Sequence, residues 1–599
     1  MLIYDIETNG LLTRVEQRGK VIPAMTKVHC IVIYDTETQE YELYDPDNMP
    51  VEMGVRRLLK AGDETCGHNI IGFDEHALKL AYPTLYEIPK NSVDTLVLAR
   101  LLNPTVKQGD FARAKKGMLP GKLIGAHSLE SYGYRLGEYK GEYGKDQDWQ
   151  TWEPEMTSYC RQDVRVTVEL YKRLQARPGF GTIACWIEMM FARFIDTQMR
   201  IGVYFNRQVH DDLIATLKAD LKVEQEIIDK SCPPFYKQKG TGLFYPKRDN
   251  KAKGYVADAP VTKIELVPFN PNANNHIYTF LIKKYGWEPE AYTEKSNEPK
   301  IDDKILAKLS EIYPECGPLG RYKLIKKRLS QVHSGNKGWS KYITANSRIH
   351  GYVNSCGAVS QRCTHSNPNL GQVPANDKPY GKRCRSCFGA TPGRVFVGCD
   401  AAGLELRLLA HFMNDPVYID LVLNGDAHQH NADILGIIRD AAKTWFYGMI
   451  YGAGAELLGK GDKKFGMMLK RKFLKEMPAF KALQDEITDQ VKRDGYLVGI
   501  AGQRLYSRSP HSALNLKLQS AGAYIMKYAA VLVWERMDFT RCSPVLNVHD
   551  EFQFESDPDY AEECGQILRQ AIIDAGTYFK LNIRMDAAYK VGATWKDTH

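Results

Sequence analysis

Residues 395–401 read VFVGCDA and residues 545–554 read VLNVHDEFQF. Both are apolar runs of strand length, and each carries one aspartate at the edge of the predicted strand, Asp400 and Asp550. The pattern between them, over residues 403–537, is largely helical. Two distant strands around a helical insertion predict one split domain, with the helical part projecting from it.

The two aspartates can form one site only if the fold brings them together. Asp550 sits in the predicted tight turn of VLNVHDEF, where aspartate is common for its turn chemistry alone. Taken singly, each is best interpreted as a turn residue. Side by side, Asp400 and Asp550 would hold a pair of divalent cations.

Between the two strands, residues 439–452 read RDAAKTWFYGMIYG. Arg439, Lys443, Tyr447 and Tyr451 recur every four residues, so on a helix they form one slowly drifting stripe. Two cations followed by two tyrosines suit a nucleoside triphosphate, whose phosphates need positive charge and whose base and sugar need a ring surface. The alternative is a solvated cationic face over packed aromatic rings. The chain has no GxxxxGK[ST] phosphate loop.

A second carboxylate set begins at the N-terminus. In LIYDIET, Asp5 and Glu7 are two residues apart, which places both on one face of a strand. Clustered acids lose solvation and repel each other, so they commonly bind a divalent cation. The alternative for this motif alone is an exposed acidic strand edge.

Two further motifs favour the metal site. HNIIGFDEH supplies Asp74, and YCRQD supplies Tyr159 and Asp163 on one helix face. Four acids and a tyrosine in this order fit a two-metal nuclease site in which Tyr159 orients the attacking water. The ensemble resembles the DEDDy class of 3′–5′ exonucleases.

Composition sets limits on the class of protein. The chain has 599 residues, 44% hydrophobic content and a net charge of +8, which fits an anionic partner without proving one. MLIYDIETNG is not a signal peptide, and no apolar run reaches the length of about 18 residues that a membrane span needs. Thirteen cysteines without scaffold spacing predict reduced thiols in a cytoplasmic compartment.

The remaining pattern divides the chain into regions. Apolar and polar segments alternate as in an α/β domain up to about residue 175, and residues 183–230 read as helical. Residues 231–270 are rich in Pro, Gly and basic side chains, which predicts an inserted loop or a small β-subdomain. Helical character returns at 275–333.

Several blocks resemble one known family. CDAAGLELRLLAHF, RDAAKTWFYGMIYG and VHDEF are similar, in order, to motifs A, B and C of family A DNA polymerases. LPGKLIGAHSLESYGYRLGEYKGEYG, SRSPHSALN and LQSAGA resemble the replicative branch found in T-seven-type phages. The resemblance implies a DNA-directed DNA polymerase, a nucleotidyltransferase of phage genome replication, with a proofreading 3′–5′ exonuclease.

The resemblance also implies the architecture. We expect an RNase H-like α/β exonuclease domain followed by a right-hand polymerase of mixed α+β structure. The expected boundaries are 1–180 for the exonuclease, 181–340 for the thumb with its inserted basic loop 231–268, 341–410 and 515–599 for the palm, and 411–514 for the fingers.

The family carries site roles onto the matching positions. Asp400 and Asp550 would bind two Mg²⁺ ions. Lys443 would contact the triphosphate and protonate pyrophosphate, with Arg439 and His428 assisting. By the same resemblance Asp5, Glu7, Asp74 and Asp163 would hold the exonuclease metals, with Tyr159 at the water.

Other implied roles concern substrate choice and DNA. Glu405, paired with the Tyr447 hydroxyl, would exclude a ribose 2′-hydroxyl, and Tyr451 would stack near the templating base. The expected contacts to primer–template are Arg362, Gln519 and His549. Glu551 and His599 receive no role.

The implied cofactor is Mg²⁺, two ions at each site, with Mn²⁺ as a substitute. The implied partners are primer–template DNA, dNTPs and a replicative helicase–primase in the cytoplasm of a host bacterium. Thioredoxin is the processivity factor of the phage relatives, but the 231–268 insertion is about half as long as theirs. Its lysines, such as Lys237, Lys239 and Lys251, either contact DNA or are the solvated side chains of a flexible loop.

The sequence disfavours two other classes of protein and a zinc site. A single-subunit RNA polymerase shares the two aspartates and the basic helix, but Glu405 and the complete exonuclease set disfavour it. A catalytically inactive DNA-binding or clamp-like protein is disfavoured because every expected carboxylate is present. A zinc site is disfavoured because only two of its candidate ligands have ligand-pair spacing. The zinc candidates are Cys356, Cys363, His365, Cys384 and Cys387.

Overall fold

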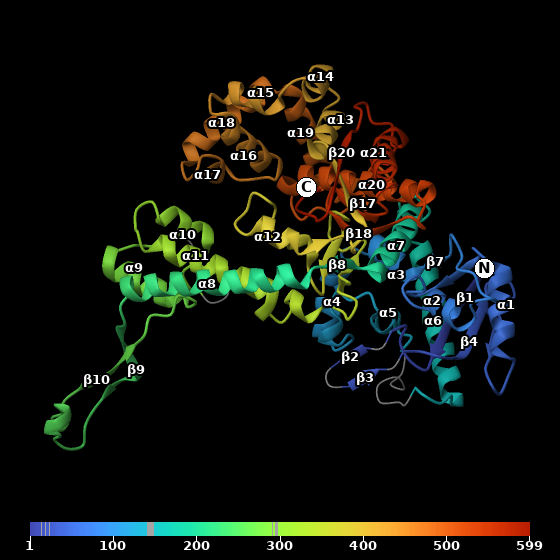
Figure 1. Ribbon diagram of the computed structural model, residues 1–599, viewed down its shortest axis with the longest axis horizontal. Coiled ribbons are helices and arrows are strands. Elements are labelled where there is room, and N and C mark those ends of the chain that lie inside the picture. Colours follow the sequence, from blue (N-terminus) through green and yellow to red (C-terminus); the bar gives the residue numbers. More distant parts are fainter. Residues whose placement is uncertain (14, 18–19, 23, 140–148, 290–291, 294–296) are drawn as a thin grey trace. The chain divides into compact units, whose positions relative to one another are not determined.

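The computed structural model describes all residues except 14, 18–19, 23, 140–148, 290–291 and 294–296 (Figure 1). The chain divides into two units. The first contains Met1–Tyr204, His350–Asn376 and Phe388–His599, and the second contains Phe205–Ile349 and Asp377–Cys387. These units divide the chain at points other than the four expected domains, so the domain division stays a prediction.

The first unit begins with a five-stranded sheet in the order β5-β4-β1-β6-β7. β4 and β5 run antiparallel to their neighbours, whereas β6 and β7 are parallel. The strands are β1 Leu2–Thr8, β4 Val28–Asp35, β5 Tyr41–Tyr44, β6 Thr65–Gly67 and β7 Val93–Asp94, with a separate hairpin of β2 Val15–Gln17 and β3 Lys20–Ile22. The helices are α1 Val51–Ala61, α2 Asp74–Ala81, α3 Thr95–Leu102, α4 Val106–Lys115, α5 Leu129–Leu136 and α6 Pro154–Gln175.

Alternation along β1 decides which face carries the acids. Leu2, Tyr4 and Ile6 belong to the core that includes Val55 and Leu58 of α1. Ile3 points to the other core, which contains Cys160 and Val164 of α6. Because side chains alternate along a strand, the residues at positions 5 and 7 share the face of Ile3 and lie toward α6. The strand predicted for LIYDIET is confirmed as β1.

A second sheet of this unit assembles strands that are far apart in the sequence. It is fully antiparallel in the order β18-β19-β15-β20. The strands are β15 Val395–Ala401, β18 Cys542–Val548, β19 Glu551–Ser556 and β20 Ala587–Gly592. Apolar residues of β15 and β19 pack in one core with α20, Ala513–Arg536, and α21, Ala561–Tyr578. The two apolar runs that the sequence predicts as strands therefore belong to one sheet.

The segment between β15 and β18 is helical, as predicted. Its elements are α13 Leu404–Met413, α14 Pro416–Asn424, α15 Ala427–Leu435, α16 Arg439–Ile450, α17 Ala455–Leu458, α18 Lys463–Glu476 and α19 Pro478–Asp494, then the hairpin β16 Leu497–Val498 and β17 Arg504–Leu505. In α16, Ala442, Trp445, Phe446 and Met449 are buried at helical spacing. This buried stripe fixes which face of α16 remains available for a site.

A buried ion pair joins two long helices of the first unit. Glu188 lies on α7, Ile183–Ile201, and is fully buried. It accepts hydrogen bonds from the Lys527 ammonium and from the Tyr524 hydroxyl, the latter at 3.0 Å, both on α20. Lys527 is 2% exposed, so neither charge has water as an alternative partner. The pair fixes how α7 and α20 are aligned.

Removing one charge of this pair is expected to be costly. Lys527→Met leaves the Glu188 carboxylate buried without its cation, which should destabilise the fold by about 3–5 kcal/mol. The double variant Glu188→Leu/Lys527→Met should regain most of that loss, because no charge is then buried alone. Urea unfolding followed by circular dichroism measures both. Equal destabilisation of the single and double variants would contradict the ion-pair interpretation.

The second unit is mainly helical. Its helices are α8 Arg207–Ser231, α9 Asn274–Tyr285, α10 Asp303–Leu309, α11 Cys316–Leu329 and α12 Gly381–Ser386. Its core draws on Ile228 from α8, Ile277 from α9, Leu306 from α10 and Leu319 from α11. Short strands elsewhere are β8 Val203–Phe205, β11 Arg348–Ile349, β12 Tyr352–Asn354, β13 Thr364–Ser366 and β14 Phe388–Gly389.

The insertion after α8 is a two-stranded ribbon, one of the two forms that the sequence allows. β9, Phe235–Phe244, pairs antiparallel with β10, Val261–Val267 (Figure 1). Most side chains of β10 are exposed, and so are Lys237, Lys239 and Lys251. The ribbon therefore presents basic side chains to solvent. Among the described helices of the chain, none is both long and apolar enough to cross a membrane.

Candidate active sites

The second sheet brings Asp400 and Asp550 together. Asp400 lies at the end of β15, directly opposite Glu551 of β19. The backbone N–H of Ala401 donates to the carbonyl oxygen of Asp550 at 3.0 Å, so the backbones of the two aspartates are adjacent. Asp550 sits in the turn between β18 and β19, where His549 has a φ of 59°. The predicted tight turn is confirmed.

The charges at this edge suit a cation. Asp400 is exposed, whereas Asp550 is partly buried. Burial raises the pKa of the Asp550 carboxyl, and the positive charges near it on His549 and Arg362 reduce that rise. A divalent ion between the two acids would favour their ionised forms, and oxygen ligands are those that Mg²⁺ prefers. The donor set therefore fits a divalent metal.

The available face of α16 carries positive charge. Lys443 is exposed there, and Arg439 pairs with Asp426 at 2.7 Å. Asp426 also caps α15 by accepting from the backbone N–H of His428. Burial lowers the pKa of His428, and the charges of Lys443 and Arg439 lower it further. Three basic groups thus act on one another, which is the electrostatic condition for binding a polyphosphate.

The partner of Glu405 differs from the prediction. Glu405 lies in the first turn of α13, and its carboxylate accepts from the Tyr451 hydroxyl at 2.8 Å and from Arg362 at 3.1 Å. The expected hydroxyl was that of Tyr447, one turn earlier. α16 ends at Ile450, so Tyr451 at its C-terminus reaches back to Glu405. Tyr447 lies beside this pair, with its ring centroid 6.0 Å from that of Tyr451, and burial together with the charge of Glu405 raises its pKa.

The three expected DNA contacts fall near one another. Arg362 and His549 line the same small cavity, together with Ala523 of α20. Gln519 lies four residues before Ala523 on that helix, so the two share a face. Amide, imidazole and guanidinium groups are all suited to phosphate and base edges. Their role in holding DNA stays a prediction.

Glu551 is a structural hub that the sequence left without a role. It is 3% exposed and accepts hydrogen bonds from Trp595 and Gln553, and its other carboxylate oxygen lies 2.8 Å from Nδ1 of His599. Both oxygens of the Glu551 carboxylate therefore have partners within the protein. Glu551 therefore holds the β18–β19 hairpin in place next to Asp550.

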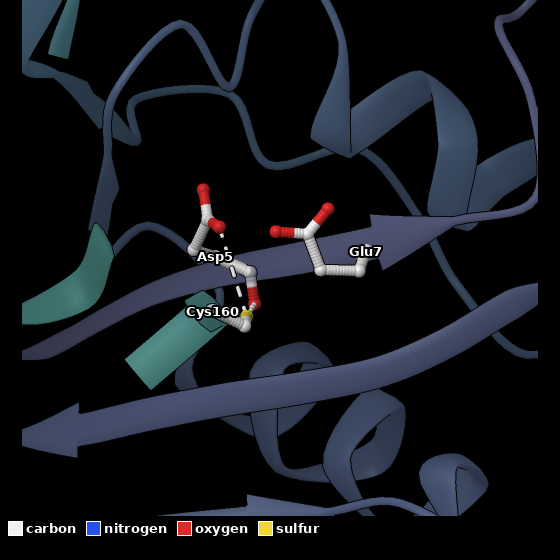
Figure 2. A group of neighbouring side chains, drawn as sticks. All are labelled: Asp5, Glu7 and Cys160. Atoms are coloured by element: carbon white, nitrogen blue, oxygen red, sulfur yellow. Dashed lines mark hydrogen bonds between the residues drawn. The ribbon is translucent and has the colours of Figure 1, made fainter. Parts of the chain in front are cut away.

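The N-terminal acids also come together. Asp5 and Glu7 project from β1 to the same side, and Cys160 of α6 lies beneath them (Figure 2). Ligand atoms of these three residues all lie within 4.8 Å of one another. The Cys160 thiol donates to the Asp5 backbone carbonyl at 3.3 Å. Burial raises the pKa of Cys160, which favours the neutral thiol that donates to β1.

The other members of the set lie on neighbouring helices. Asp74 is the first residue of α2 and is 5% exposed. Burial raises its pKa, and the charge of Asp5 raises it further, so the two carboxyl groups are close. Asp163 is buried on α6, and Tyr159, four residues earlier, lies on the same face. A cation would relieve the repulsion between these acids.

Cys160 is the residue that sequence reasoning missed at this site. Its signal was present: Cys160 precedes Asp163 by three residues, one helical turn, within YCRQD. Within the described residues, the Asp5–Glu7–Cys160 group is the one cluster of three such ligands. The zinc candidates therefore do not assemble in the described part of the chain.

Carboxylates at a strand edge, beside a helix that presents basic groups, are typical of enzymes that transfer nucleotidyl groups. Comparison with known proteins makes this specific. The sequence profile of DNA polymerase family A matches residues 251–597. The chain is 32% identical to the DNA-directed DNA polymerases of Enterobacteria phage T3 and Escherichia phage T7, with both partners covered completely. The chain belongs to DNA polymerase family A.

More distant relatives agree over part of the chain. The thermostable DNA polymerase I of Thermus aquaticus is 25% identical over 56% of this chain and 43% of its own length. Among solved structures, the polymerase domain of Pol1 from M. smegmatis, in complex with DNA primer–template and dNTP, has a TM-score of 0.72. That likeness covers 99% of this chain and 96% of the other at 16% identity, and shows the fold.

Family membership establishes the activity. The protein is a metal-dependent, DNA-directed DNA polymerase of mixed α and β structure, with template DNA and deoxynucleoside triphosphates as its substrates. The expected polymerase function is confirmed.

Proposed function

We propose that this polymerase works through two separate metal sites, one for synthesis and one for 3′–5′ exonucleolytic proofreading. The proposal depends on one observation: two pairs of carboxylates lie at two different sheets. The pairs are Asp400 with Asp550 and Asp5 with Glu7. The five-stranded sheet is proposed to be an RNase H-like exonuclease domain. The DNA polymerases of phages T3 and T7 support this assignment through similarity over their full lengths.

At the synthesis site, Asp400 and Asp550 would hold two Mg²⁺ ions, which would supply activation of the attacking oxygen and positive charge for the leaving group. Lys443 would bind the triphosphate and donate a proton to the departing pyrophosphate. Arg439 would exchange its pairing with Asp426 for a phosphate oxygen, since both partners of that pair are half exposed. The remaining barrier is lowered by orientation of primer and nucleotide.

At the exonuclease site, Asp5, Glu7, Asp74 and Asp163 would bind the metal pair, and Tyr159 would orient the water that attacks the terminal phosphodiester. A mispaired primer end frays more readily than a paired one, which supplies this site with single-stranded substrate. Cys160 would position Asp5 by its hydrogen bond to the strand backbone.

Both activities are expected to require a divalent cation. Removal of metal by a chelator should abolish primer extension and 3′ degradation, and excess Mg²⁺ should restore both, with Mn²⁺ able to substitute. Gel analysis of a 5′-labelled primer, with and without dNTPs, reports both reactions. Either activity persisting in the chelator would overturn the metal assignment for that site.

Substrate choice is expected to depend on two tyrosines in different ways. Tyr451→Phe removes the hydroxyl that holds Glu405, so ribonucleotide incorporation should rise by about tenfold, the effect of one hydrogen bond to a charged group. Tyr447→Phe retains that bond and should instead lower acceptance of dideoxynucleotides, whose missing 3′-hydroxyl the Tyr447 hydroxyl replaces. Single-nucleotide incorporation kinetics separate the two. Identical profiles for the two variants would contradict this division of roles.

Partners follow from the family and from the exposed ribbon. We propose the β9–β10 ribbon, with Lys237, Lys239 and Lys251, as the surface for DNA or for a processivity factor such as thioredoxin. A replicative helicase–primase in a bacterial cytoplasm is the further partner that phage replication implies. The division into exonuclease, thumb, palm and fingers at residues 180, 340, 410 and 514 is proposed on the same basis.

A further inference from the structure

A pocket of about 360 Å³ opens in the first unit, where α3 ends and where α4, α5 and the end of α6 approach one another. Its lining includes Arg113, Arg135, Arg173 and Arg177, and no acidic side chain. Tyr506, which follows β17, completes the wall. Four arginines around one cavity are a strong local concentration of positive charge.

Only part of this charge is neutralised. Asp110, fully buried on α4, accepts from Arg135 at 2.7 Å and from Arg113 at 3.3 Å. One carboxylate against four guanidinium groups leaves three positive charges at the pocket. Asp110 also accepts from the backbone N–H of Gly125, so it is held in place and fixes the two arginines.

The other two arginines are available to a ligand. Arg173 lies in the last turn of α6 and Arg177 follows that helix, and both are exposed. Neither forms an ion pair with an acid of the described residues. An exposed guanidinium can bind phosphate oxygens through two parallel hydrogen bonds. Two such groups, four residues apart, match more than one phosphate.

The buried wall of the pocket offers groups for a nucleoside. Tyr132, 4% exposed, has the Arg135 guanidinium over its ring at 4.8 Å and accepts from Asn103 at 3.3 Å. Asn103 is 8% exposed, and its Oδ1 has no hydrogen-bond partner among the described residues. An amide oxygen without a partner is suited to an amino or hydroxyl group of a ligand.

The local field agrees with this geometry. Burial lowers the pKa of His127 to about 4, with the positive charges of Arg135 and Arg100 contributing. His127 bonds to the Tyr132 hydroxyl at 2.9 Å, directly behind the pocket wall. The pocket therefore disfavours any further cation and favours an anion.

This pocket lies outside both carboxylate sets. Arg173 is ten residues after Asp163 on α6, which is about 15 Å along the helix. A ligand-binding role of the pocket therefore does not depend on the assignment of either catalytic site. DNA and deoxynucleoside triphosphates, the substrates of this family, both carry consecutive phosphate groups. They are therefore the anions that we expect this pocket to bind.

We propose that this pocket binds nucleotide phosphates, as consecutive phosphodiesters of a single DNA strand. Arg173 and Arg177 contact the phosphates, Arg113 and Arg135 supply the positive wall, and Asn103 with the tyrosine rings accepts the sugar or base. A nucleoside triphosphate presents the same chemistry, and the test distinguishes it from a strand.

The test compares Arg173→Gln/Arg177→Gln with Arg56→Gln/Lys60→Gln in the full chain. The control residues lie four positions apart on α1 and are also exposed, so both variants lose two charges. Fluorescence anisotropy with a labelled oligothymidylate, in chelator so that neither metal site reacts, gives affinity as a function of salt. Calorimetry with dTTP in chelator gives the nucleotide arm. Thermal unfolding checks that each variant is folded.

We expect the pocket variant to bind the oligonucleotide about tenfold more weakly, with a salt dependence reduced by about 1.4, the release expected for two phosphate contacts on a single strand. The control variant should match the wild type, and dTTP binding should be unchanged. A loss confined to dTTP would assign the pocket to free nucleotides and overturn the strand. Equal behaviour of the pocket and control variants in both arms would overturn the site.

Discussion

Asp400→Ala is expected to abolish primer extension while leaving 3′ degradation intact. The carboxylate lies at the end of β15 beside the β18–β19 turn, so its loss removes one of the two acids that we propose as metal ligands there. A metal-assisted step loses several kcal/mol of stabilisation without its ligand, which lowers the rate at least about 10³-fold. Extension of a matched, 5′-labelled primer with dNTPs measures synthesis.

The matched control is Asp485→Ala, which removes an exposed acid that pairs with Lys481 on α19. It should extend primers at the wild-type rate, because exposed ion pairs contribute little to stability. Synthesis by Asp400→Ala at the control rate would contradict the assignment of the second sheet as the synthesis site.

Asp5→Ala is expected to have the opposite effect. It removes the acid that lies within 4.8 Å of Glu7 and whose charge acts on Asp74. Degradation of a labelled single strand should fall at least about 10³-fold, and primer extension should keep its rate. The measurement is the release of labelled mononucleotide with time in Mg²⁺.

For Asp5 the control is Glu40→Ala, an exposed acid before β5 on the same sheet. It should degrade single strands as the wild type does. If Asp5→Ala also degraded them at that rate, the N-terminal set would not be an exonuclease site. If it lost synthesis as well, the two activities would not be separable in the way proposed.

Much of the architecture was readable from local pattern. Alternation in LIYDIET placed Asp5 and Glu7 on one strand face, and the four-residue spacing in RDAAKTWFYGMIYG placed Lys443 on one helix stripe with Arg439. The split sheet also followed from two distant apolar runs. Because the segment between them is helical, both runs were expected to be strands of one domain. The first two predictions depend only on neighbours in sequence, and the third depends on the order of the elements along the chain.

Contacts that depend on the exact end of an element were not readable. The sequence favoured Tyr447 as the partner of Glu405, but α16 ends at Ile450 and the hydroxyl of Tyr451 makes the bond. One turn of helix separates the two tyrosines, and only the packing of α13 against α16 decides between them. Helix ends are the least certain part of a pattern.

Contacts between distant residues were also beyond the sequence. Nothing local links Glu551 to Trp595 and His599, yet these groups fix the carboxylate beside Asp550. The arginine pocket is similar, since its cations come from three separate helices. Charge counting along the chain gave a modest excess of +8, which says nothing about where it gathers.

The most direct test of two separate sites is complementation on a primer with a mismatched 3′ end. Asp400→Ala should remove the mismatch without extending the primer, and Asp5→Ala should fail to extend the mismatched end efficiently. A mixture of the two variants should yield full-length product, because one protein removes the mismatch and the other extends the trimmed end. Full-length product from Asp400→Ala alone, or none from the mixture, would contradict the account.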